Sequence, residues 1–450
     1  MKLSDIAHAI TGELVGLDAD VGSFSTDTRT LQADDVFIAL SGTRTNANGL
    51  LTQAAAKGAL AAITEHLDPS AGIAQIVVAD SHAALGKLAA AWCARFPKLT
   101  KVAITGSAGK TSTKEMTARI FESLGNTLAT QGNFNNDIGV PLTLLRLRAE
   151  HQYGVFELGA NHLGEIAYTA AMVKPHAAVI TNVGSAHLEG FGSREGIARA
   201  KGEIYAALAD NCVAVVNRDD EFAESWLHSM GSRRVVTFSL QPGADIYASE
   251  ISHGNTPEYA FRLHIGGQSA AVQLQVLGRH QVANALAAAG LAHACGVSLH
   301  AIVHGLSNTR PFMGRSVLHR LGESYLIDDT YNANPDSMKA AIDLLCTLPG
   351  RRVLVVGDMG ELGDATASGH REVGAYAKMK KIDALLTTGE HQLFYAEGFG
   401  NQTQLFPDHH ALVKALEHEL QGVVSALVKG SRSAHMERVV QAVSESAGVH

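Results

Sequence analysis

The sequence predicts an α/β protein of three domains: a small N-terminal α+β domain, a central domain with a doubly wound parallel sheet, and a C-terminal α/β domain. The chain has 450 residues, which is more than one ordinary hydrophobic core accommodates. Apolar runs that suit buried strands alternate with helical patterns over its second and third parts, as in parallel sheets covered by helices. We expect the domains to cover residues 1–82, 83–311 and 312–450.

The composition is that of a globular protein and argues against several classes of function. Hydrophobic residues make up 46% of the chain and charged residues 18%, so a packed core is expected. The net charge of -8 argues against nucleic-acid binding, because such proteins usually carry a basic face. The four cysteines are far apart and form no CxxC pair, which suits reduced thiols in the cytoplasm. Asp5 and Glu13 interrupt the apolar run that a signal peptide requires. We therefore expect a cytoplasmic protein that binds neither nucleic acid nor membrane.

The first two domains show a clear pattern of short strands and helices. In the first domain, β-like runs at 36–40 and 75–78 flank an alanine-rich helix near 52–60. The central domain opens with a strand at 101–105, followed by a glycine loop and a helix whose apolar residues recur every four positions. Further segments are expected as strands at 153–158, 177–181 and 213–217, and as hairpins or an inserted β segment at 231–268.

The third domain again alternates strands and helices, and each expected strand runs into a polar loop. These strands are at 325–328, 353–356, 384–387 and 425–428. Ligands in open α/β sheets bind outside the carboxyl ends of the strands. The loops DDTYNANPDS, GDMGELG, TGEH and KGSRS therefore predict a binding site along one edge of this sheet.

The strongest single motif is TGSAGKT, residues 105–111, between a strand and a helix. Glycines let backbone N–H groups turn toward phosphate oxygens, and the helix N-terminus adds partial positive charge. Lys110 would reach the β- and γ-phosphates of a nucleotide, and the Thr111 hydroxyl would bind Mg²⁺. Ile104 stands where the strict pattern has its first glycine, and the alternative is an ordinary glycine-rich turn. The strand before the loop and the helix after it favour ATP or GTP binding.

Two residues at neighbouring strand ends would complete a metal site. Glu157 ends an apolar strand, where a carboxylate is costly unless it is paired or binds a cation. His187 follows the next strand and would lie at the same sheet edge. Taken singly, each could be an ordinary residue facing water. Together with the phosphate loop, they indicate a metal-dependent nucleotide site.

Two further groups of polar residues suit ligand binding. His280 and Asn284 lie four residues apart on an expected helix, so both could contact one ligand. Lys429 and Ser431 follow a strand and lie close to a helix start, a favourable place for a substrate carboxylate. Arg432, beside them, is better explained as a solvated loop charge.

The segments STDTR (25–29) and FIALSG (37–42) lie in the first domain, and nine further motifs follow one another through the second and third, so that the pattern spans about residues 22–440. The nine motifs are TGSAGKTSTKEM, ELGAN, AHLEGFGS, AKGEI, GRHQVANALAA, RPFMGR, DDTYNANPDSM, GDMGELG and LVKGSRS. In sequence and in order they resemble the Mur ligase family. The resemblance implies an N-terminal domain for a UDP-sugar substrate, a central ATP-binding P-loop domain and a Rossmann-like C-terminal domain. It also implies a monomeric, ADP-forming peptide ligase of peptidoglycan synthesis that uses ATP and Mg²⁺, with two metal ions expected.

The resemblance assigns roles to single residues. The residues expected to be catalytic are Lys110, Glu157, His187 and Lys201. The expected metal ligands are Thr111, Glu157, His187 and Lys201, the last as a carbamate. Expected contacts with ATP come from Gly106, Ser107, Ala108, Gly109, Lys110, Thr111, Ser112, His280, Asn284, Arg315, Asp329, Tyr331 and Asn332. Among these, the resemblance places His280 and Asn284 at the adenine, Arg315 at phosphate, Asp329 at the ribose, and Tyr331 and Asn332 beside the base. Expected contacts with the other substrates come from Ser25, Thr26, Asp27, Thr28, Arg29, Asn133, Asn135, Asn136, Asp137, Lys429 and Ser431.

The last-domain loops also resemble those of one member of the family. TYNANPDSM, GDMGELG and VKGSRS are similar to the ligase that joins D-alanyl-D-alanine to UDP-N-acetylmuramoyl-tripeptide through an acyl phosphate. The nearest alternative is another Mur-type or a folylpolyglutamate-type amino-acid ligase. An alternative of a different class is a P-loop regulatory NTPase that forms no ligated product. Polar loops at the strand ends of two α/β domains favour an enzyme with a cleft.

Overall fold

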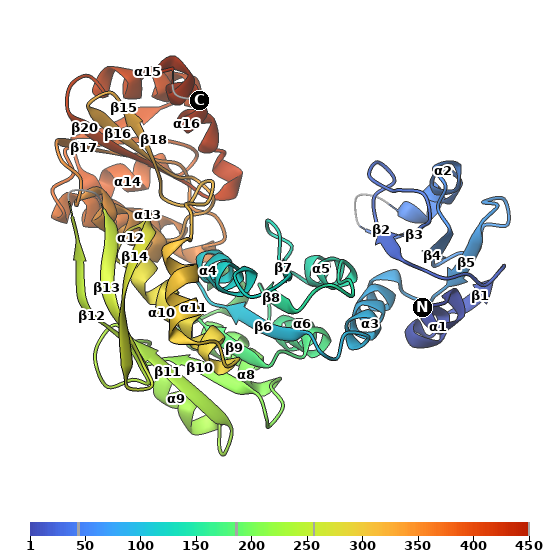
Figure 1. The fold of residues 1–450 in the computed structure, drawn as a ribbon. Coiled ribbons are helices and arrows are strands. Elements are labelled where there is room, and N and C mark those ends of the chain that lie inside the picture. The colour runs from blue at the N-terminus through green and yellow to red at the C-terminus, as the bar shows by residue number, and fades with distance from the viewer. Residues whose placement is uncertain (43–45, 185–187, 255–256, 449–450) are drawn as a thin grey trace. The chain divides into compact units, whose positions relative to one another are not determined.

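The protein is known as a computed structural model, and the residues that it describes form two compact units and three β-sheets (Figure 1). The sheets have five, nine and six strands, which confirms the predicted α/β class. The residues that the structure describes are 1–42, 46–184, 188–254 and 257–448. The first unit consists of Met1–Ala103, Gly125–Gly159 and Glu165–Pro175, and the other described residues form the second unit.

The five-stranded sheet belongs to the first unit and has the order β1-β5-β4-β3-β2. Strands β2 to β5 are parallel neighbours, and β1 runs antiparallel to β5. The helix expected near 52–60 ends earlier, because the chain turns at Gly58 with a φ of 87° and enters a strand at Ala61. The elements are α1 (Leu3–Ile10), β1 (Glu13–Val15), β2 (Ser23–Ser25), β3 (Asp35–Ile38), η1 (Ala47–Leu50), α2 (Leu51–Ala56), β4 (Ala61–Thr64), β5 (Ala74–Val77) and α3 (Ser81–Ala94).

The nine-stranded sheet has the order β14-β13-β12-β11-β10-β9-β6-β8-β7. Its strands are β6 (Thr100–Thr105), β7 (Thr127–Ala129), β8 (Tyr153–Glu157), β9 (Ala177–Ile180), β10 (Val213–Asn217), β11 (Arg234–Ser239), β12 (Ile246–His253), β13 (Glu258–Ile265) and β14 (Gln268–Leu277). Strands β9 to β12 pair in parallel, whereas β12, β13 and β14 form an antiparallel meander. The meander extends the β segment expected at 231–268 to Leu277, because residues alternate between buried and exposed along most of β14.

The helices of this part are α4 (Lys110–Glu122), α5 (Gly139–Leu145), α6 (Glu165–Val173), α7 (Leu188–Phe191), α8 (Arg194–Ala206), α9 (Ala223–Ser229), α10 (His280–Ala294) and α11 (Leu299–Ser307). In the second unit, α10 and α11 both pack beside α4 (Figure 1). Gly305 permits the close approach of α11, because a Cβ there would lie 2.5 Å from the Cα of Ile120. Helix α4, which follows the glycine loop, is thus fixed from the side by two neighbours.

The six-stranded sheet has the order β15-β16-β20-β17-β18-β19 and is parallel except for β15. Its strands are β15 (Val317–Leu321), β16 (Ser324–Asp329), β17 (Arg351–Val356), β18 (Ala384–Thr388), β19 (Thr403–Phe406) and β20 (Val424–Lys429). The helices and turns around them are α12 (Pro335–Leu345), η2 (Gly363–Ala365), α13 (Thr366–Met379), α14 (Gln392–Phe399), α15 (His409–Glu419), η3 (Arg432–Ala434) and α16 (Glu437–Ser446).

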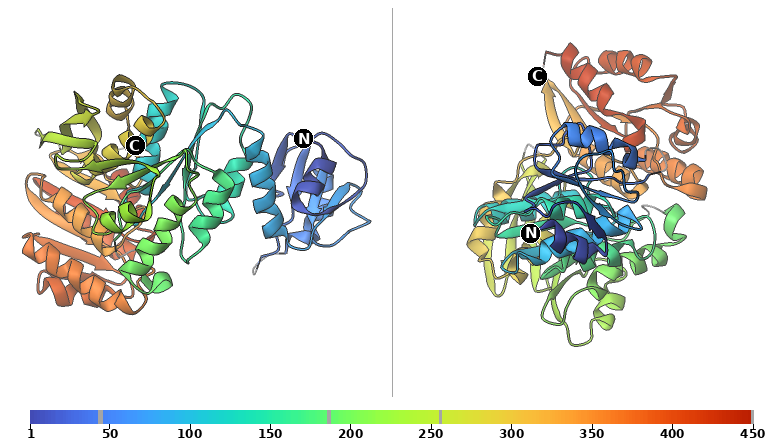
Figure 2. Two further views of the ribbon diagram at one scale, coloured as in Figure 1. Left: turned by 90° about the horizontal axis from the view of Figure 1, so that it is seen from below. Right: turned by 90° about the vertical axis from the view of Figure 1, so that its right-hand side faces the viewer.

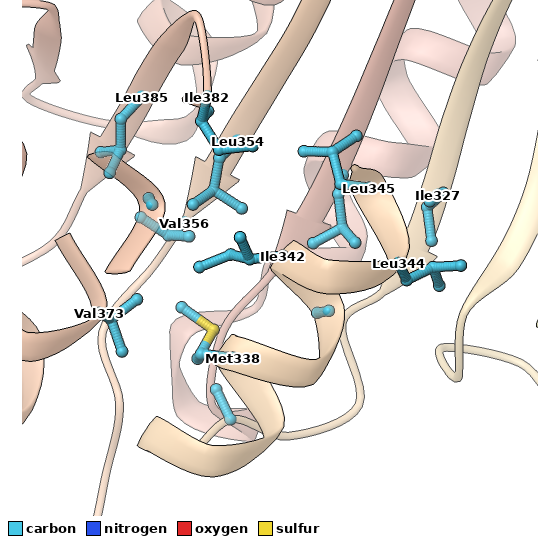
Figure 3. Packing of buried hydrophobic residues seen from close by; sticks show 14 of the residues in the cluster. Ile327, Met338, Ile342, Leu344, Leu345, Leu354, Val356, Val373, Ile382 and Leu385 are labelled. Carbon is cyan, nitrogen blue, oxygen red and sulfur yellow. The ribbon is translucent and has the colours of Figure 1, made fainter. Parts of the chain in front are cut away.

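Helices cover both faces of this sheet, so each face has its own core (Figure 1 and Figure 2). Side chains alternate between the faces along each strand: Leu354 and Val356 of β17 belong to one core, and Val353 and Val355 to the other. Figure 3 shows the first core, in which Ile342 of α12 lies among strand residues. Helices α12, α13 and α14 close this core, and α15 and α16 close the opposite one.

Among the described residues, no helix is both long enough and apolar enough to cross a membrane.

Candidate functional site

The phosphate loop lies between β6 and α4, and its shape depends on two glycines. Gly106 has a φ of 151°, and a Cβ there would lie 1.8 Å from Thr181 Oγ1. Gly109 has a φ of 79° and precedes the first residue of α4. Side chains other than glycine are strained in such conformations. The Lys110 ammonium donates a hydrogen bond to the Gly106 carbonyl at 2.7 Å, so this lysine lies over the loop.

The loop contains a buried hydroxyl that suits a phosphate ligand. Ser107 is 7% exposed, and its Oγ has no hydrogen-bond partner among the residues that the structure describes. A buried hydroxyl without a partner usually marks a place for a ligand or an ordered water. The first hydrogen bond of the helix runs from Thr113 N–H to Gly109 C=O, so the amides before it point out of the helix end. These donors and Lys110 suit an anion.

Arg315 joins the segment before the last sheet to the phosphate loop. Its guanidinium donates a hydrogen bond to Thr111 Oγ1 at 2.8 Å, although the two residues are 204 positions apart. The same guanidinium stacks over the Tyr331 ring, 4.0 Å from the ring centre. The structure therefore brings together three residues that the sequence assigned to one nucleotide site.

A buried ion pair lies at the end of the last-domain sheet. The Lys429 ammonium contacts Asp329 Oδ2 at 2.6 Å and donates to the carbonyl of Asn332 at 2.8 Å. The two charged side chains are only 4% and 15% exposed. Asp329 also accepts a hydrogen bond from the Ser316 N–H at 3.0 Å. The sequence assigned Lys429 to substrate and Asp329 to the ribose. The structure adds that their charges neutralise each other.

His280 and Asn284 lie on the first turns of α10, close to the residues described above. Burial lowers the pKa of His280, the negative charge of Asp329 opposes this shift, and the positive charge of Lys429 adds to it. Asn284 is 6% exposed, and a Cβ on Gly109 would lie 2.2 Å from its Oδ1. Asn284 thus lies against the phosphate loop. Its assignment to the adenine stays a prediction.

Lys201 is buried within α8 with 1% of its surface exposed. Burial holds the pKa of its amine well below the ordinary value, and repulsion from Lys110 lowers it further. The ammonium form is thus disfavoured, and the neutral amine is the form that can react with CO₂. This chemistry is consistent with the expected carbamate, which stays a prediction.

In the first unit, Glu157 and Asn135 contact each other. Glu157 is 2% exposed at the end of β8, and its Oε1 accepts a hydrogen bond from Asn135 Nδ2 at 2.8 Å. The Glu157 N–H donates to Thr130 Oγ1 at 3.0 Å, which fixes the strand end. His187 lies outside the described residues. Within the described part of the chain, no three His, Cys, Asp or Glu residues form a cluster that could hold a metal ion.

The predicted substrate residues that remain in the first unit lie in the loop between β7 and α5 and around the end of β2, and Thr28 among them is buried. Asn136 accepts a hydrogen bond from the Gly139 N–H at 2.8 Å, and Asn133 and Asp137 are exposed beside it. Four further predicted residues belong to the turn after β2, which comprises Thr26, Asp27, Thr28 and Arg29, and Ser25 is the last residue of that strand.

A carboxylate and a guanidinium shape the turn after β2. Asp27 and Arg29 form an ion pair at 2.6 Å, and the hydrogen bond from Arg29 lowers the pKa of Asp27 to about 2. Arg29 is 87% exposed, so it is open to an anionic ligand.

The GDMGELG loop and the loop after β20 contact each other through Ser431 and Asp358. The Ser431 N–H donates to the Asp358 carbonyl at 2.9 Å. The first of these loops is anchored by His370, whose Nε2 accepts the Met359 N–H at 3.1 Å while its Nδ1 donates to the Thr366 carbonyl at 2.6 Å. Burial lowers the pKa of His370, and the bond to Thr366 and the charge of Asp358 partly oppose this shift.

Thr181 and Asn182 follow β9 and contact the phosphate loop, although neither was predicted as a site residue from the sequence. Asn182 Oδ1 accepts the Ala108 N–H at 3.0 Å, and the Asn182 carbonyl accepts the Ser107 N–H at 2.9 Å. The amides of Ser107 and Ala108 therefore point toward the end of β9, although the glycine-rich motif had predicted that the loop amides point toward phosphate. The available signal was a pair of polar residues at the carboxyl end of an apolar parallel strand.

Comparison with known proteins gives matches over nearly the whole chain. The family model described as the Mur ligase middle domain matches residues 104–292, and that described as the Mur ligase, glutamate ligase domain matches residues 314–432. The UDP-N-acetylmuramoyl-tripeptide–D-alanyl-D-alanine ligase of Escherichia coli (strain K12) is 45% identical over 452 residues, which cover 99% of each chain.

Solved structures give the same result. A crystal structure of MurF from Acinetobacter baumannii superposes with a TM-score of 0.93 at 39% identity, covering 98% of each chain. The MurF ligase of Thermotoga maritima in complex with ADP has a TM-score of 0.85 at 27% identity, covering 95% of this chain and 98% of that one.

Proposed function

Because this chain belongs to the Mur ligase family, we propose that it joins D-alanyl-D-alanine to UDP-N-acetylmuramoyl-tripeptide, with ATP converted to ADP and phosphate. The names of the relatives support the assignment, and so does their similarity over almost their entire length. In the structure, the observation that carries the proposal is the hydrogen bond from Arg315 to Thr111. It joins the segment that leads into the last domain to the phosphate loop of the central one, as a two-domain nucleotide site requires.

The proposed reaction has two steps. The terminal carboxylate of the tripeptide attacks the γ-phosphorus of ATP, and ADP leaves. The amine of D-alanyl-D-alanine then attacks the resulting acyl phosphate, and inorganic phosphate leaves. Lys110, Arg315 and the N-terminus of α4 present positive charge where charge develops on the phosphoryl group. No side chain is needed as a nucleophile, so positioning and electrostatics supply the rate.

The chain also offers oxygen donors of the kind that Mg²⁺ prefers. We assign the Thr111 hydroxyl, the Glu157 carboxylate, His187 and a carbamate on Lys201 to two metal ions. The ions would neutralise charge on the phosphates. The burial of Lys201 and the lowered pKa of its amine support the carbamate. A ¹³C resonance that appears with labelled bicarbonate, and is absent in a Lys201→Met variant, is the expected result.

The remaining assignments follow the family. We place the nucleotide base and ribose at His280, Asn284, Asp329, Tyr331 and Asn332. The UDP-sugar peptide is assigned to residues 25–29 and to the loop at 133–137, and the incoming dipeptide to the Lys429 and Ser431 region. We further propose the domain boundaries 1–82, 83–311 and 312–450, a monomer, and a location in the cytoplasm.

Mass spectrometry of the product tests this function directly. Purified protein, ATP, Mg²⁺, UDP-N-acetylmuramoyl-tripeptide and D-alanyl-D-alanine should give the UDP-linked pentapeptide and one phosphate for each peptide bond. Phosphate release stimulated by diaminopimelate or glutamate instead would assign another ligase activity. Hydrolysis of ATP without any new peptide bond would favour a regulatory NTPase.

A Lys110→Ala variant tests the role of the loop. It should lose dipeptide-dependent phosphate release while its circular dichroism spectrum is unchanged. Near-normal turnover would show that this loop is not the catalytic one.

A further inference from the structure

Thr181 and Asn182 form a clamp on one peptide of the phosphate loop. The Asn182 side chain accepts the Ala108 N–H at 3.0 Å and donates to the Ala108 carbonyl at 3.1 Å. The Thr181 hydroxyl donates to the same carbonyl at 2.6 Å. Both backbone groups of Ala108 are therefore bonded to residues that follow β9. We call Thr181 and Asn182 the β9 clamp.

The clamp continues along the main chain beside it. The Ser107 N–H donates to the Asn182 carbonyl at 2.9 Å, and the Thr181 N–H donates to the Thr105 carbonyl at 2.9 Å. The first half of the loop is thus paired with the end of β9 in the manner of an extended strand. Only its second half, from Gly109 into α4, turns its amides toward the helix end, where an anion binds.

The β9 clamp is itself held from the next strand. Asn217, at the end of β10, is 7% exposed and donates from Nδ2 to the Thr181 carbonyl at 2.8 Å. Asp220 accepts the Val183 N–H at 2.7 Å, just beyond the clamp. A group fixed by buried partners loses little entropy when it positions a ligand site. Strand ends, which are rigid, therefore determine the path of the glycine loop.

The clamp also restricts Gly106 to glycine. A Cβ on Gly106 would lie 1.8 Å from Thr181 Oγ1, the same oxygen that donates to Ala108. The threonine hydroxyl thus occupies the space that a larger loop residue would need.

From these contacts we propose that Thr181 and Asn182 are positioning residues for the triphosphate of ATP. They act through the Ala108 peptide, which fixes the turn that aims Lys110 and the first amides of α4 at the phosphates. This inference rests on the proposed function, because it assumes that the loop binds ATP. It predicts a selective effect on nucleotide affinity.

The test uses the full chain and four variants. Thr181→Val removes the hydroxyl at constant shape, and Thr181→Ser keeps the hydroxyl. Asn182→Ala removes both side-chain bonds to Ala108. Asn308→Ala is the matched control, because Asn308 is exposed at the end of α11 and its side-chain amide bonds to His304, far from the phosphate loop in sequence.

Calorimetric titration with Mg²⁺ and ATP, together with KM values for all three substrates, gives the readout. Thr181→Val and Asn182→Ala should raise both the Kd and the KM for ATP about tenfold, which corresponds to one or two hydrogen bonds. The KM for the UDP-linked peptide and the unfolding temperature should stay near those of the wild type. Thr181→Ser and Asn308→Ala should bind ATP as the wild type does.

The outcomes separate this inference from the proposed function. A wild-type chain that binds no ATP contradicts the proposed function itself. A wild type that binds ATP, with Thr181→Val and Asn182→Ala binding equally well, contradicts only the clamp. Equal weakening by Thr181→Val and by Thr181→Ser, which keeps the hydroxyl, would mean that loss of the hydroxyl bond is not the cause, and would also contradict the clamp. A similar rise in every KM, or a matching fall in unfolding temperature, would show a merely structural role.

Discussion

The ion pair between Lys429 and Asp329 predicts a large local loss of stability when its cation is removed. A Lys429→Met change deletes the contact to Asp329 Oδ2 at 2.6 Å and the bond to the Asn332 carbonyl at 2.8 Å. It also leaves a carboxylate that is 15% exposed with its charge uncompensated. Removing one partner of a buried pair costs about 3–5 kcal/mol. The Ser316 N–H still bonds to Asp329, which favours the lower end of that range.

Hydrogen exchange of the amides in β16 and β20 measures this cost where it arises. A loss of about 3–5 kcal/mol accelerates exchange through opening of these strands by roughly two to three and a half orders of magnitude. Local exchange is the better assay because a chain with several domains does not unfold in one two-state step. The double variant Asp329→Asn with Lys429→Met should recover part of the loss, since no charge is then left buried.

The control is the same substitution at Lys414, which is exposed on α15 and should change exchange very little. The structural role of the pair would be refuted by one result in particular. Unchanged exchange in β16 and β20, combined with a raised KM for the dipeptide, would mean that Lys429 serves the substrate alone.

Three further predictions concern other buried groups. In the absence of bicarbonate, Lys201→Met should raise the unfolding temperature at pH 7, because burial of the amine disfavours its charged form and lowers its pKa. Ligase activity should fall, and an unchanged or lower unfolding temperature would contradict this prediction. Gly305→Ala should destabilise the packing of α11 on α4 by about 1–3 kcal/mol, because its Cβ would meet the α4 backbone, and hydrogen exchange of the amides in these two helices measures this cost. Gly22→Ala, whose Cβ would meet nothing within 4 Å, should be nearly neutral in the same assay. His370 has a lowered pKa in the folded chain, so its contribution to stability is complete above the unfolded-state pKa of about 6.5 and is lost as the pH falls through the folded value. The unfolding temperature should therefore fall between pH 7.5 and 5. His370→Gln keeps an acceptor for the Met359 N–H and should reduce the dependence of the unfolding temperature on pH. An equal dependence in the wild type and the variant would exclude His370 as the source of this loss.

The phosphate loop was predictable because its signal is local. The glycines, Lys110 and Thr111 are consecutive, and the strand and helix on either side have their own patterns. The cap of α12, which was not among the predictions, has an equally local pattern: Asn334 accepts the Ser337 N–H at 2.9 Å, with Pro335 in the first turn. Such features depend on residues within one turn of each other, so they can be predicted from a single sequence.

The contacts that hold the loop were not predictable, because they depend on which strands become neighbours. The β9 clamp bonds to a loop more than seventy positions earlier in the chain. A polar residue at the end of a parallel strand indicates only that a ligand could bind near it. Nothing in the sequence says that Asn182 faces the Ala108 peptide. The partners of Arg315 were hidden for the same reason, since its predicted role named a phosphate and the structure also gives Thr111 and Tyr331.

The order of the strands in the last sheet explains why its loops act together. The final strand, β20, lies between β16 and β17 in the sheet, although β17 is the next strand after β16 along the chain. In the register of this insertion Lys429 lies opposite Asp329 on one side and Val356 on the other. Lys429, the last residue of β20, therefore bonds to the Asn332 carbonyl in the loop after β16, and Ser431 in the loop after β20 bonds to Asp358 in the loop after β17. Because β20 is the last strand of this sheet along the chain, the three polar loops have their mutual contacts only when the C-terminal segment is paired with β16 and β17. A chain shortened before Val424 would keep the phosphate loop but lose the contacts that arrange the last domain's share of the site.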